Sequence, residues 1–140
     1  MSVEQNKTIA NRLVEEGINK GNLSLFDELA TPDGVDHALP PGFPPGVAGN
    51  KQFFTMLRAA FPDFHYVIED TIAEGDHVVQ RVVGHGTMKG EFLGMQPTGK
   101  HATWSEMHIV RMKNGKIVEH WGNVGQLGML QQLGLAPLPA

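Results

Sequence analysis

The sequence predicts a single α+β domain spanning residues 1–140, in which a strongly curved, mostly antiparallel sheet wraps around N-terminal helices and forms a cone with an internal pocket. Three observations support this fold class. Apolar residues recur with helical spacing mainly in the first part of the chain, whereas later segments alternate apolar and polar residues as half-buried strands do. Two of these strand-like runs flank residues 113–116, whose Asn-Gly centre is a strong hairpin signal. A length of 140 residues suffices for one core of ordinary size.

The N-terminal segment is predicted to form two helices. Residues 3–20 carry apolar side chains near a helical spacing, and Gly21 ends this first helix. The second helix stops before Thr31-Pro32, because the residue before a proline disfavours helical backbone. Its buried side is formed by Leu23, Leu25, Phe26 and Leu29.

A proline-rich segment separates a short predicted strand, residues 33–39, from a third helix. The segment, residues 40–46, forms neither a helix nor an inner strand, because proline lacks an amide donor and fixes φ. We interpret it as a rim loop, either a semi-rigid lid that carries Phe43 over the mouth of the pocket or a simple connection. The third helix covers about residues 50–60 and ends at Phe61-Pro62-Asp63.

Strands dominate the second half of the chain. Residues 65–73 and 77–87 form two strands joined by a Glu-Gly-Asp turn, and a glycine-rich connection covers residues 86–99. The Asn-Gly hairpin follows, and then a short helix over about residues 124–133. The tail, residues 136–140, is predicted to be loose.

The composition excludes several classes of partner and site. The net charge is −4 and no basic run exceeds two residues, so nucleic acid and acidic membrane surfaces are not expected as partners. The chain has no cysteine, which removes disulfides, thiolate metal sites and a cysteine nucleophile. None of the seven histidines stands in a His-x-His or His-Glu-x-x-His pattern, so we expect no metal site. No stretch approaches the ~20 apolar residues that span a bilayer, and no secretory signal is visible, so we expect a cytoplasmic protein.

Polar residues alternate with apolar ones in both strands of the hairpin. Trp104, Glu106 and His108 share one parity in the first strand, and Glu119, Trp121 and Asn123 share one in the second. Alternate residues of a strand point to the same face of a sheet. A face that carries tryptophan, glutamate and histidine together is typical of a pocket wall, so the sequence indicates a protein with a small-molecule cavity.

The C-terminal motifs resemble a known family. Residues 115–121, Gly-Lys-Ile-Val-Glu-His-Trp, followed by residues 126–134, Gln-Leu-Gly-Met-Leu-Gln-Gln-Leu-Gly, are similar to the SnoaL-like polyketide cyclases, also described as ester cyclases. Residues 90–100 resemble the loop that precedes these motifs in the family, and Arg81 and Val35-Asp36-His37 fall at matching strand positions. The resemblance covers nearly the whole chain and places it in the nuclear-transport-factor-type cone superfamily, whose members have varied activities or none.

The resemblance implies a specific chemistry. Characterised cyclases of this type close a ring by intramolecular aldol condensation without metal or cofactor, and an acidic side chain is the acid/base. Relatives often carry aspartate directly after the tryptophan and again before the C-terminal helix, whereas this chain has Gly122 and Gly125 at those positions. The outer face of the sheet often pairs subunits in this superfamily, so a homodimer is expected.

Proton abstraction next to a carbonyl needs a base and a donor for the developing oxyanion. Burial in an apolar cone moves the pKa of a carboxyl up and that of a histidine down, toward values that suit acid/base catalysis. The candidate bases are Glu106, Glu119, His37 and His108. Arg81 is the fixed cation, which can hold a substrate carboxylate or pair with one of the glutamates. We predict Glu106, Glu119, His108 and Arg81 as catalytic residues, and His37, Phe43, Trp104, Trp121 and Asn123 as substrate-binding residues.

Several candidates also have a purely structural interpretation. Arg81 and a glutamate can form a structural ion pair, and Trp121 can belong to the core. His37 is interpreted as pocket-lining rather than catalytic. The remaining histidines are interpreted as ordinary half-exposed strand residues: His65, His77, His85, His101 and His120.

Two functions remain open at the level of the sequence. The first is a cofactor-free cyclase, isomerase or lyase that acts by acid/base chemistry on a small hydrophobic carbonyl compound. The second is a non-catalytic protein that binds such a molecule in the same pocket, which the glycines at positions 122 and 125 favour. A purely dimeric scaffold is a third interpretation.

Overall fold

The computed structural model describes residues 2–138. The helical elements are α1 (Val3–Arg12), its π-helical continuation η1 (Leu13–Ile18), α2 (Leu25–Leu29), α3 (Gly46–Ala60) and α4 (Gln126–Leu133). The strands are β1 (Ala30–Asp36), β2 (His65–Glu74), β3 (His77–Thr87), β4 (His101–Lys113) and β5 (Lys116–Val124).

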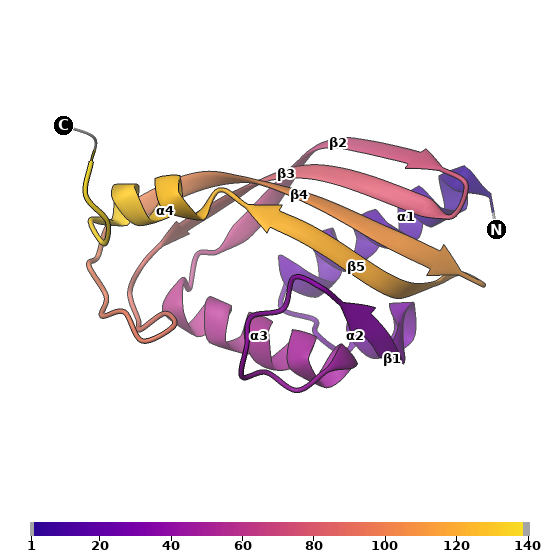
Figure 1. Cartoon of the computed structure of the whole chain (residues 1–140), viewed down its shortest axis with the longest axis horizontal. Helices are drawn as coiled ribbons and strands as arrows, with labels where there is room; N and C mark the ends of the chain where they lie inside the picture. Colours follow the sequence, from indigo (N-terminus) through magenta and orange to yellow (C-terminus); the bar gives the residue numbers. More distant parts are fainter. Residues whose placement is uncertain (1, 139–140) are drawn as a thin grey trace.

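The strands form one open, curved sheet in the order β1-β5-β4-β3-β2, and the helices α1, α2 and α3 lie on one side of it (Figure 1). β1 pairs in parallel with β5, and all other neighbouring strands are antiparallel. This arrangement confirms the predicted α+β class with a mostly antiparallel sheet around N-terminal helices.

The first helix is fixed at its start by a capping box. The Ser2 hydroxyl accepts a hydrogen bond from the Gln5 amide, and the Gln5 side chain accepts one from the Ser2 amide. η1 continues the same helix with wider turns as far as Ile18. Directly after it, the Asn19 side chain donates to the carbonyl of Tyr66 and accepts from its amide, at 2.8 and 2.7 Å. This clamp fixes the start of β2 against the N-terminal helix.

The segment between α2 and α3 differs most from the prediction. β1 begins at Ala30 and includes Pro32, which an edge strand tolerates because one row of its amides has no partner within the sheet. α3 begins at Gly46 rather than near residue 50. Its first turn contains glycine because the loop passes very close to it: a Cβ on Gly49 would lie 1.8 Å from the Pro44 carbonyl oxygen.

The other elements agree with the prediction within a few residues, including both hairpins and the C-terminal helix. The tail predicted to be loose, residues 136–140, extends beyond the described range because residues 139 and 140 lie outside it. Among the described helices, none is both long enough and apolar enough to cross a bilayer.

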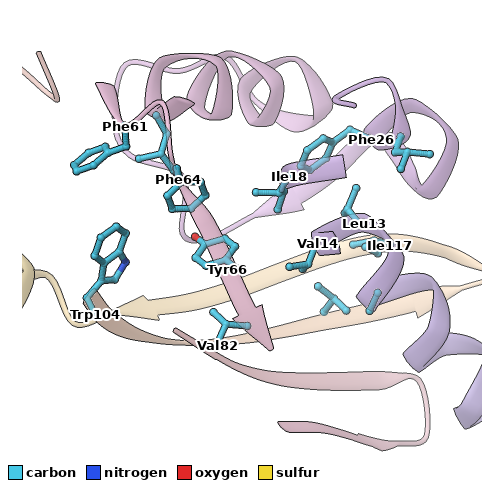
Figure 2. Close-up of a cluster of buried hydrophobic side chains, with 14 of the residues drawn as sticks. Leu13, Val14, Ile18, Phe26, Phe61, Phe64, Tyr66, Val82, Trp104 and Ile117 are labelled. Carbon is cyan, nitrogen blue, oxygen red and sulfur yellow. The ribbon is translucent and has the colours of Figure 1, made fainter. Parts of the chain in front are cut away.

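The core lies between the sheet and the helices, and it has an aromatic end and a mainly aliphatic end that also holds Phe26 (Figure 2). At the aromatic end the rings of Phe61 and Phe64 lie 6.0 and 6.1 Å from that of Trp104. At the other end aliphatic side chains from η1 face Ile117 of β5. Tyr66 lies between the two ends, so its hydroxyl is surrounded by the core rather than by water.

Candidate functional site

Two adjoining cavities occupy the space between the sheet and the helices. The outer cavity has a volume of about 180 Å³ and is bordered in part by the exposed residues Leu93, Val124 and Gln126. The inner cavity has a volume of about 100 Å³ and is enclosed mainly by core side chains, such as Leu13 and Val82. Six residues line both cavities and form what we call the shared wall: Asp36, Asn50, Phe54, Tyr66, His108 and His120. Ionisable and amide groups therefore gather at one place in a largely apolar space.

Strand β4 brings three of the predicted residues to the cavity side of the sheet. Trp104, Glu106 and His108 alternate along the strand and all line the outer cavity. The Glu106 side chain is only 4% exposed, and its Oε2 accepts a hydrogen bond from Trp104 Nε1 at 2.6 Å. Its Oε1 lies 2.7 Å from His108 Nε2. A carboxyl group inside an apolar space needs such partners to offset its lost hydration, and Glu106 has them on both oxygens.

Tyr66 of β2 supplies a further donor to the same carboxyl. Its hydroxyl donates to Glu106 Oε1 at 2.8 Å. Burial raises the pKa of Tyr66 well above its ordinary value, and the negative charge of Glu106 and the hydrogen bond to it act in the same direction. Tyr66 therefore remains protonated and serves as a fixed donor.

A bulge in β5 decides which of its side chains reach the cavities. Ile117 pairs with Met112 and Glu119 with Arg111, so two steps along β5 oppose one step along β4 and Val118 is the extra residue. Ile117 and His120 both face the cavities although they are three residues apart. The bulge therefore turns the even-numbered residues after it inward and the odd-numbered ones outward.

The end of β1 completes the shared wall. Asp36 lies beside His120 in the parallel pairing of β1 with β5, and its Oδ1 lies 2.8 Å from His120 Nδ1. The same oxygen accepts from the Ala38 amide, and Oδ2 accepts from Asn50 Nδ2 of α3 at 2.7 Å. Burial by itself raises the pKa of Asp36, but the hydrogen bond and charge of His120, with the donors of Ala38 and Asn50, outweigh it. The net pKa of Asp36 therefore lies below its ordinary value.

Gly122 leaves room for the His108 ring. A Cβ added to Gly122 would lie 2.6 Å from His108 Nδ1 and 2.9 Å from its Cε1. Position 122 thus faces the cavities, as the bulge requires, and the imidazole of His108 occupies the space that a side chain there would need. The glycine and the histidine are sterically linked.

The structure corrects three of the predicted charged or polar site residues. Arg81 faces the outer side of the sheet, where it is 48% exposed and its Nε bonds to Asp70 at 2.7 Å, so it meets neither predicted glutamate. Glu119 also lies on the outer side because of the bulge, and it bonds to Arg111 and to His37 Nε2 at 3.0 and 2.7 Å. His37 is half exposed in this pair and lines none of the cavities described above.

Three further predicted binding residues are placed away from the cavities. Trp121 and Asn123 follow the bulge at odd positions and face outward, and the Trp121 ring stacks on that of His37 at 5.2 Å. Phe43 packs edge-on against Phe53 at 5.7 Å, and Phe53 lines the outer cavity while Phe43 does not. The proline-rich loop does border the outer cavity, through Pro40.

The prediction missed Asp36, Asn50, Tyr66 and His120 as site residues. His120 was interpreted as an ordinary strand histidine, yet its two ring nitrogens bond to Asp36 and His108. Asp36 had a usable signal, since it stands in the motif that carried the family resemblance. Tyr66 is the single tyrosine of the chain, but its pairing with a glutamate 40 residues away has no mark in the sequence.

Over residues 2–138, no group of three or more histidine, aspartate and glutamate side chains is arranged to hold a metal ion. The polar groups of the shared wall instead bond to one another. Their arrangement suits hydrogen bonding and proton transfer at a bound organic molecule.

Comparison with known proteins gives consistent results. A family model described as SnoaL-like polyketide cyclase matches residues 8–133. The chain is 31% identical over 118 residues to a nogalonic acid methyl ester cyclase of Streptomyces nogalater, covering 83% of this chain and 88% of that protein. The crystal structure of IdmH from Streptomyces antibioticus, a candidate polyketide cyclase, superposes with a TM-score of 0.80 at 34% identity, covering 93% of this chain and 99% of that one. TsrD from Streptomyces laurentii has a TM-score of 0.88 at 20% identity, covering 97% and 99%, and shares the fold.

Proposed function

The chain belongs to the SnoaL-like polyketide cyclase family, and we propose that it closes a ring in a small hydrophobic carbonyl compound by acid/base chemistry that needs no cofactor. The observation that carries this proposal is the Glu106 carboxyl, which lies within an apolar cavity beside His108. Its Oε1 has two hydrogen-bond partners, whereas its Oε2 accepts from Trp104 alone. A carboxylate oxygen accepts about two hydrogen bonds, so Oε2 retains a lone pair for a substrate proton.

The proposed step is an intramolecular aldol addition. Glu106 Oε2 takes the proton from the carbon next to a carbonyl, and the electrons of that C–H bond form an enolate. The enolate carbon attacks a second carbonyl of the same molecule, which forms the C–C bond and leaves an alkoxide. The alkoxide then takes the proton back from Glu106, so protons and charge balance over the cycle.

Asn50 is suited to stabilise the oxyanion of this reaction. Its Nδ2 must face Asp36 Oδ2, because an ionised carboxylate only accepts hydrogen bonds. An amide nitrogen carries two hydrogens, and one of them makes this bond. The second is available to a substrate oxygen in either cavity, both of which Asn50 lines.

The outer cavity offers aromatic surfaces to a flat, apolar substrate. The side chains of Trp104, Phe92, Phe53 and Phe54 line it, and Glu106 lies next to Trp104. Aromatic rings contact such molecules over a large area without much loss of conformational entropy. This lining supports a hydrophobic carbonyl compound as the substrate class.

Replacing Glu106 by glutamine tests the proposal. With nogalonic acid methyl ester as the probe, we expect the wild type to form a cyclised product and E106Q to lower kcat about 100-fold or more. Glu119→Gln is the matched control, because Glu119 lies on the outer side of the sheet, and it is expected to retain wild-type turnover. Circular dichroism and thermal unfolding check that both variants fold. Full turnover by folded E106Q would refute the acid/base role, and saturable binding of the probe without product would favour the non-catalytic binding protein.

We also propose that the protein is a homodimer paired through the outer face of the sheet. Large apolar side chains are exposed on that face: Val67, Ile72, Met107 and Ile109. Contiguous apolar residues on a sheet face are typical of a surface covered by another chain. Light scattering should give the mass of a dimer for the wild type and of a monomer for Met107→Glu, and a monomeric wild type at micromolar concentration would refute this pairing. A cytoplasmic location stays a prediction from the sequence.

A further inference from the structure

Four side chains from three strands form one continuous hydrogen-bonded chain along the shared wall. His120 Nδ1 lies 2.8 Å from Asp36 Oδ1, and His120 Nε2 lies 2.8 Å from His108 Nδ1. His108 Nε2 in turn lies 2.7 Å from Glu106 Oε1. The two imidazole planes differ by 17°, so the N–H of one ring can point at the lone pair of the other. We call this arrangement the acid–histidine chain, in the order Asp36–His120–His108–Glu106.

The number of protons in this chain follows from its geometry. Three links join four side chains, and each link needs one proton between its two heavy atoms. A neutral imidazole carries one ring proton and a protonated one carries two, so two neutral rings supply only two of the three. The third proton must therefore sit either on a carboxyl group or on one of the two histidines.

The surroundings of the carboxyl groups favour the histidines as the place of the third proton. Glu106 also accepts from Trp104 Nε1, which can only donate, and from the Tyr66 hydroxyl. Asp36 also accepts from the Ala38 amide and from Asn50 Nδ2. Hydrogen bonds of this kind stabilise the ionised form of a carboxylate. Within residues 2–138, Tyr66 is the one further titratable group that bonds to the acid–histidine chain.

We propose that His108 and His120 share a single positive charge between the carboxylates of Asp36 and Glu106, and that the acid–histidine chain acts as one acid/base unit. Glu106 is the catalytic residue of the unit, since its Oε2 receives the substrate proton. Asp36 and His120 are positioning residues: they hold His108 in place and keep the pair of rings protonated. This inference rests on the proposed function for its catalytic meaning, but the shared charge is a property of the resting protein.

The shared charge gives the unit a direct role in the reaction. Before proton transfer the acid–histidine chain carries two negative charges and one positive charge, and the substrate is neutral. After Glu106 takes the proton, Glu106 is neutral and the enolate carries the negative charge. The positive histidine pair then faces the enolate in place of the carboxylate, so the total charge of the site does not change. A fixed cation next to a developing anion stabilises it most strongly in a site of low dielectric constant.

The same unit explains how the protein can carry out acid/base chemistry although position 122 holds a glycine. A Cβ there would lie 2.6 Å from the His108 ring, so a side chain at position 122 would displace His108 and break the acid–histidine chain. In this protein the acid/base group comes from β4, one strand away from position 122, and it is supported by the neighbouring His120.

Nitrogen NMR of the histidine rings in the ligand-free protein tests the shared charge. In the wild type at pH 7, we expect three ring protons in total on His108 and His120, with assignments from the His108→Gln and His120→Gln spectra. Asp36→Asn keeps a side-chain oxygen that can accept a hydrogen bond from His120. The Asn50 amide can rotate so that its oxygen faces the new amide nitrogen at position 36. The substitution therefore preserves the hydrogen bonds but removes the negative charge. We expect D36N to lose the third proton at a lower pH than the wild type does, because the neighbouring negative charge is gone. Glu119→Gln, which alters a similar histidine–carboxylate pair outside the chain, should leave these signals unchanged.

Turnover of nogalonic acid methyl ester tests the positioning role. We expect D36N to lower kcat about tenfold or more with little change in KM, and to move the alkaline limb of the pH–rate profile to lower pH. Two ring protons in the wild type at pH 7, or a D36N titration equal to that of the wild type, would overturn the inference while leaving the proposed function standing. Three ring protons in a protein that turns over no probe would support the shared charge and overturn the proposed function.

Discussion

The contact between Gly122 and His108 leads to a prediction that can be worked out in free energy. In Gly122→Ala the new Cβ would lie 2.6 Å from His108 Nδ1, closer than the 3.0 Å that real Cβ atoms keep. The imidazole cannot easily retreat, because both of its nitrogens are held, at 2.8 and 2.7 Å. Overpacking of this kind typically costs about 1–3 kcal/mol of the free energy of unfolding.

Without the His108 ring, Gly122→Ala should raise the free energy of unfolding instead of lowering it. In the His108→Ala background the next atom to the new Cβ is Ala38 Cβ at 3.4 Å, an ordinary contact. Alanine is favoured over glycine within a strand by about 0.5–1 kcal/mol, because it loses less backbone entropy on folding. The difference between the two backgrounds gives a coupling energy of about 1.5–4 kcal/mol between positions 108 and 122.

Urea unfolding of the wild type, G122A, H108A and the double variant measures this coupling, at one fixed protein concentration. The cost of losing the histidine's hydrogen bonds occurs on both sides of the cycle and cancels. Additivity of the two substitutions within about 0.5 kcal/mol would show that the His108 ring does not fill the space at Gly122, and the reasoning would then fail.

Three further predictions concern single groups. Tyr66 is the only tyrosine, so ultraviolet titration reports on it alone, and it should detect no phenolate in the folded protein near pH 10. E106Q should lower the pKa of Tyr66, because it removes a neighbouring negative charge. A titration midpoint near pH 10 in the wild type would contradict the burial of Tyr66 against Glu106. The lowered pKa of Asp36 means that its ionised form stabilises the fold above about pH 4 and that this contribution is lost as the pH falls through the lower folded value. The unfolding free energy of the wild type relative to D36N should therefore shrink below about pH 4, and a pH-independent difference would argue against the pairing with His120. Gly128 lies within α4 with no atom near its potential Cβ, so Gly128→Ala should stabilise the protein by about 0.5–1 kcal/mol, and a lower melting temperature would show an unseen contact there.

The two strands of the last hairpin show why the same sequence rule succeeded once and failed once. In β4 the alternation predicted that Trp104, Glu106 and His108 share the cavity side, and they do, because the strand runs without interruption through that region. In β5 the extra residue Val118 shifts the phase by one. Residues 116–121, which flank Val118, contain no glycine or proline to mark a bulge, so the pattern assigned the wrong residues to the cavity.

Arg81 illustrates a different difficulty. In β3, apolar residues stand at both parities, with Val78 and Val82 on one and Val79 and Val83 on the other. Alternation therefore does not say which side faces the core. The structure buries Val78 and Val82 completely, which turns Arg81 outward to Asp70.

The sequence by itself determined the α+β class, the order of the elements, the family and the shared face of Trp104, Glu106 and His108 in β4, because all of these depend on local periodicity, turn chemistry and contiguous motifs. Only the tertiary structure decided which acids and histidines meet. Asp36 and His120 are 84 residues apart, and Tyr66 and Glu106 are 40 apart. Such contacts arise from strand register, one bulge and the packing of helices on the sheet, and each of these is a property of the folded chain as a whole.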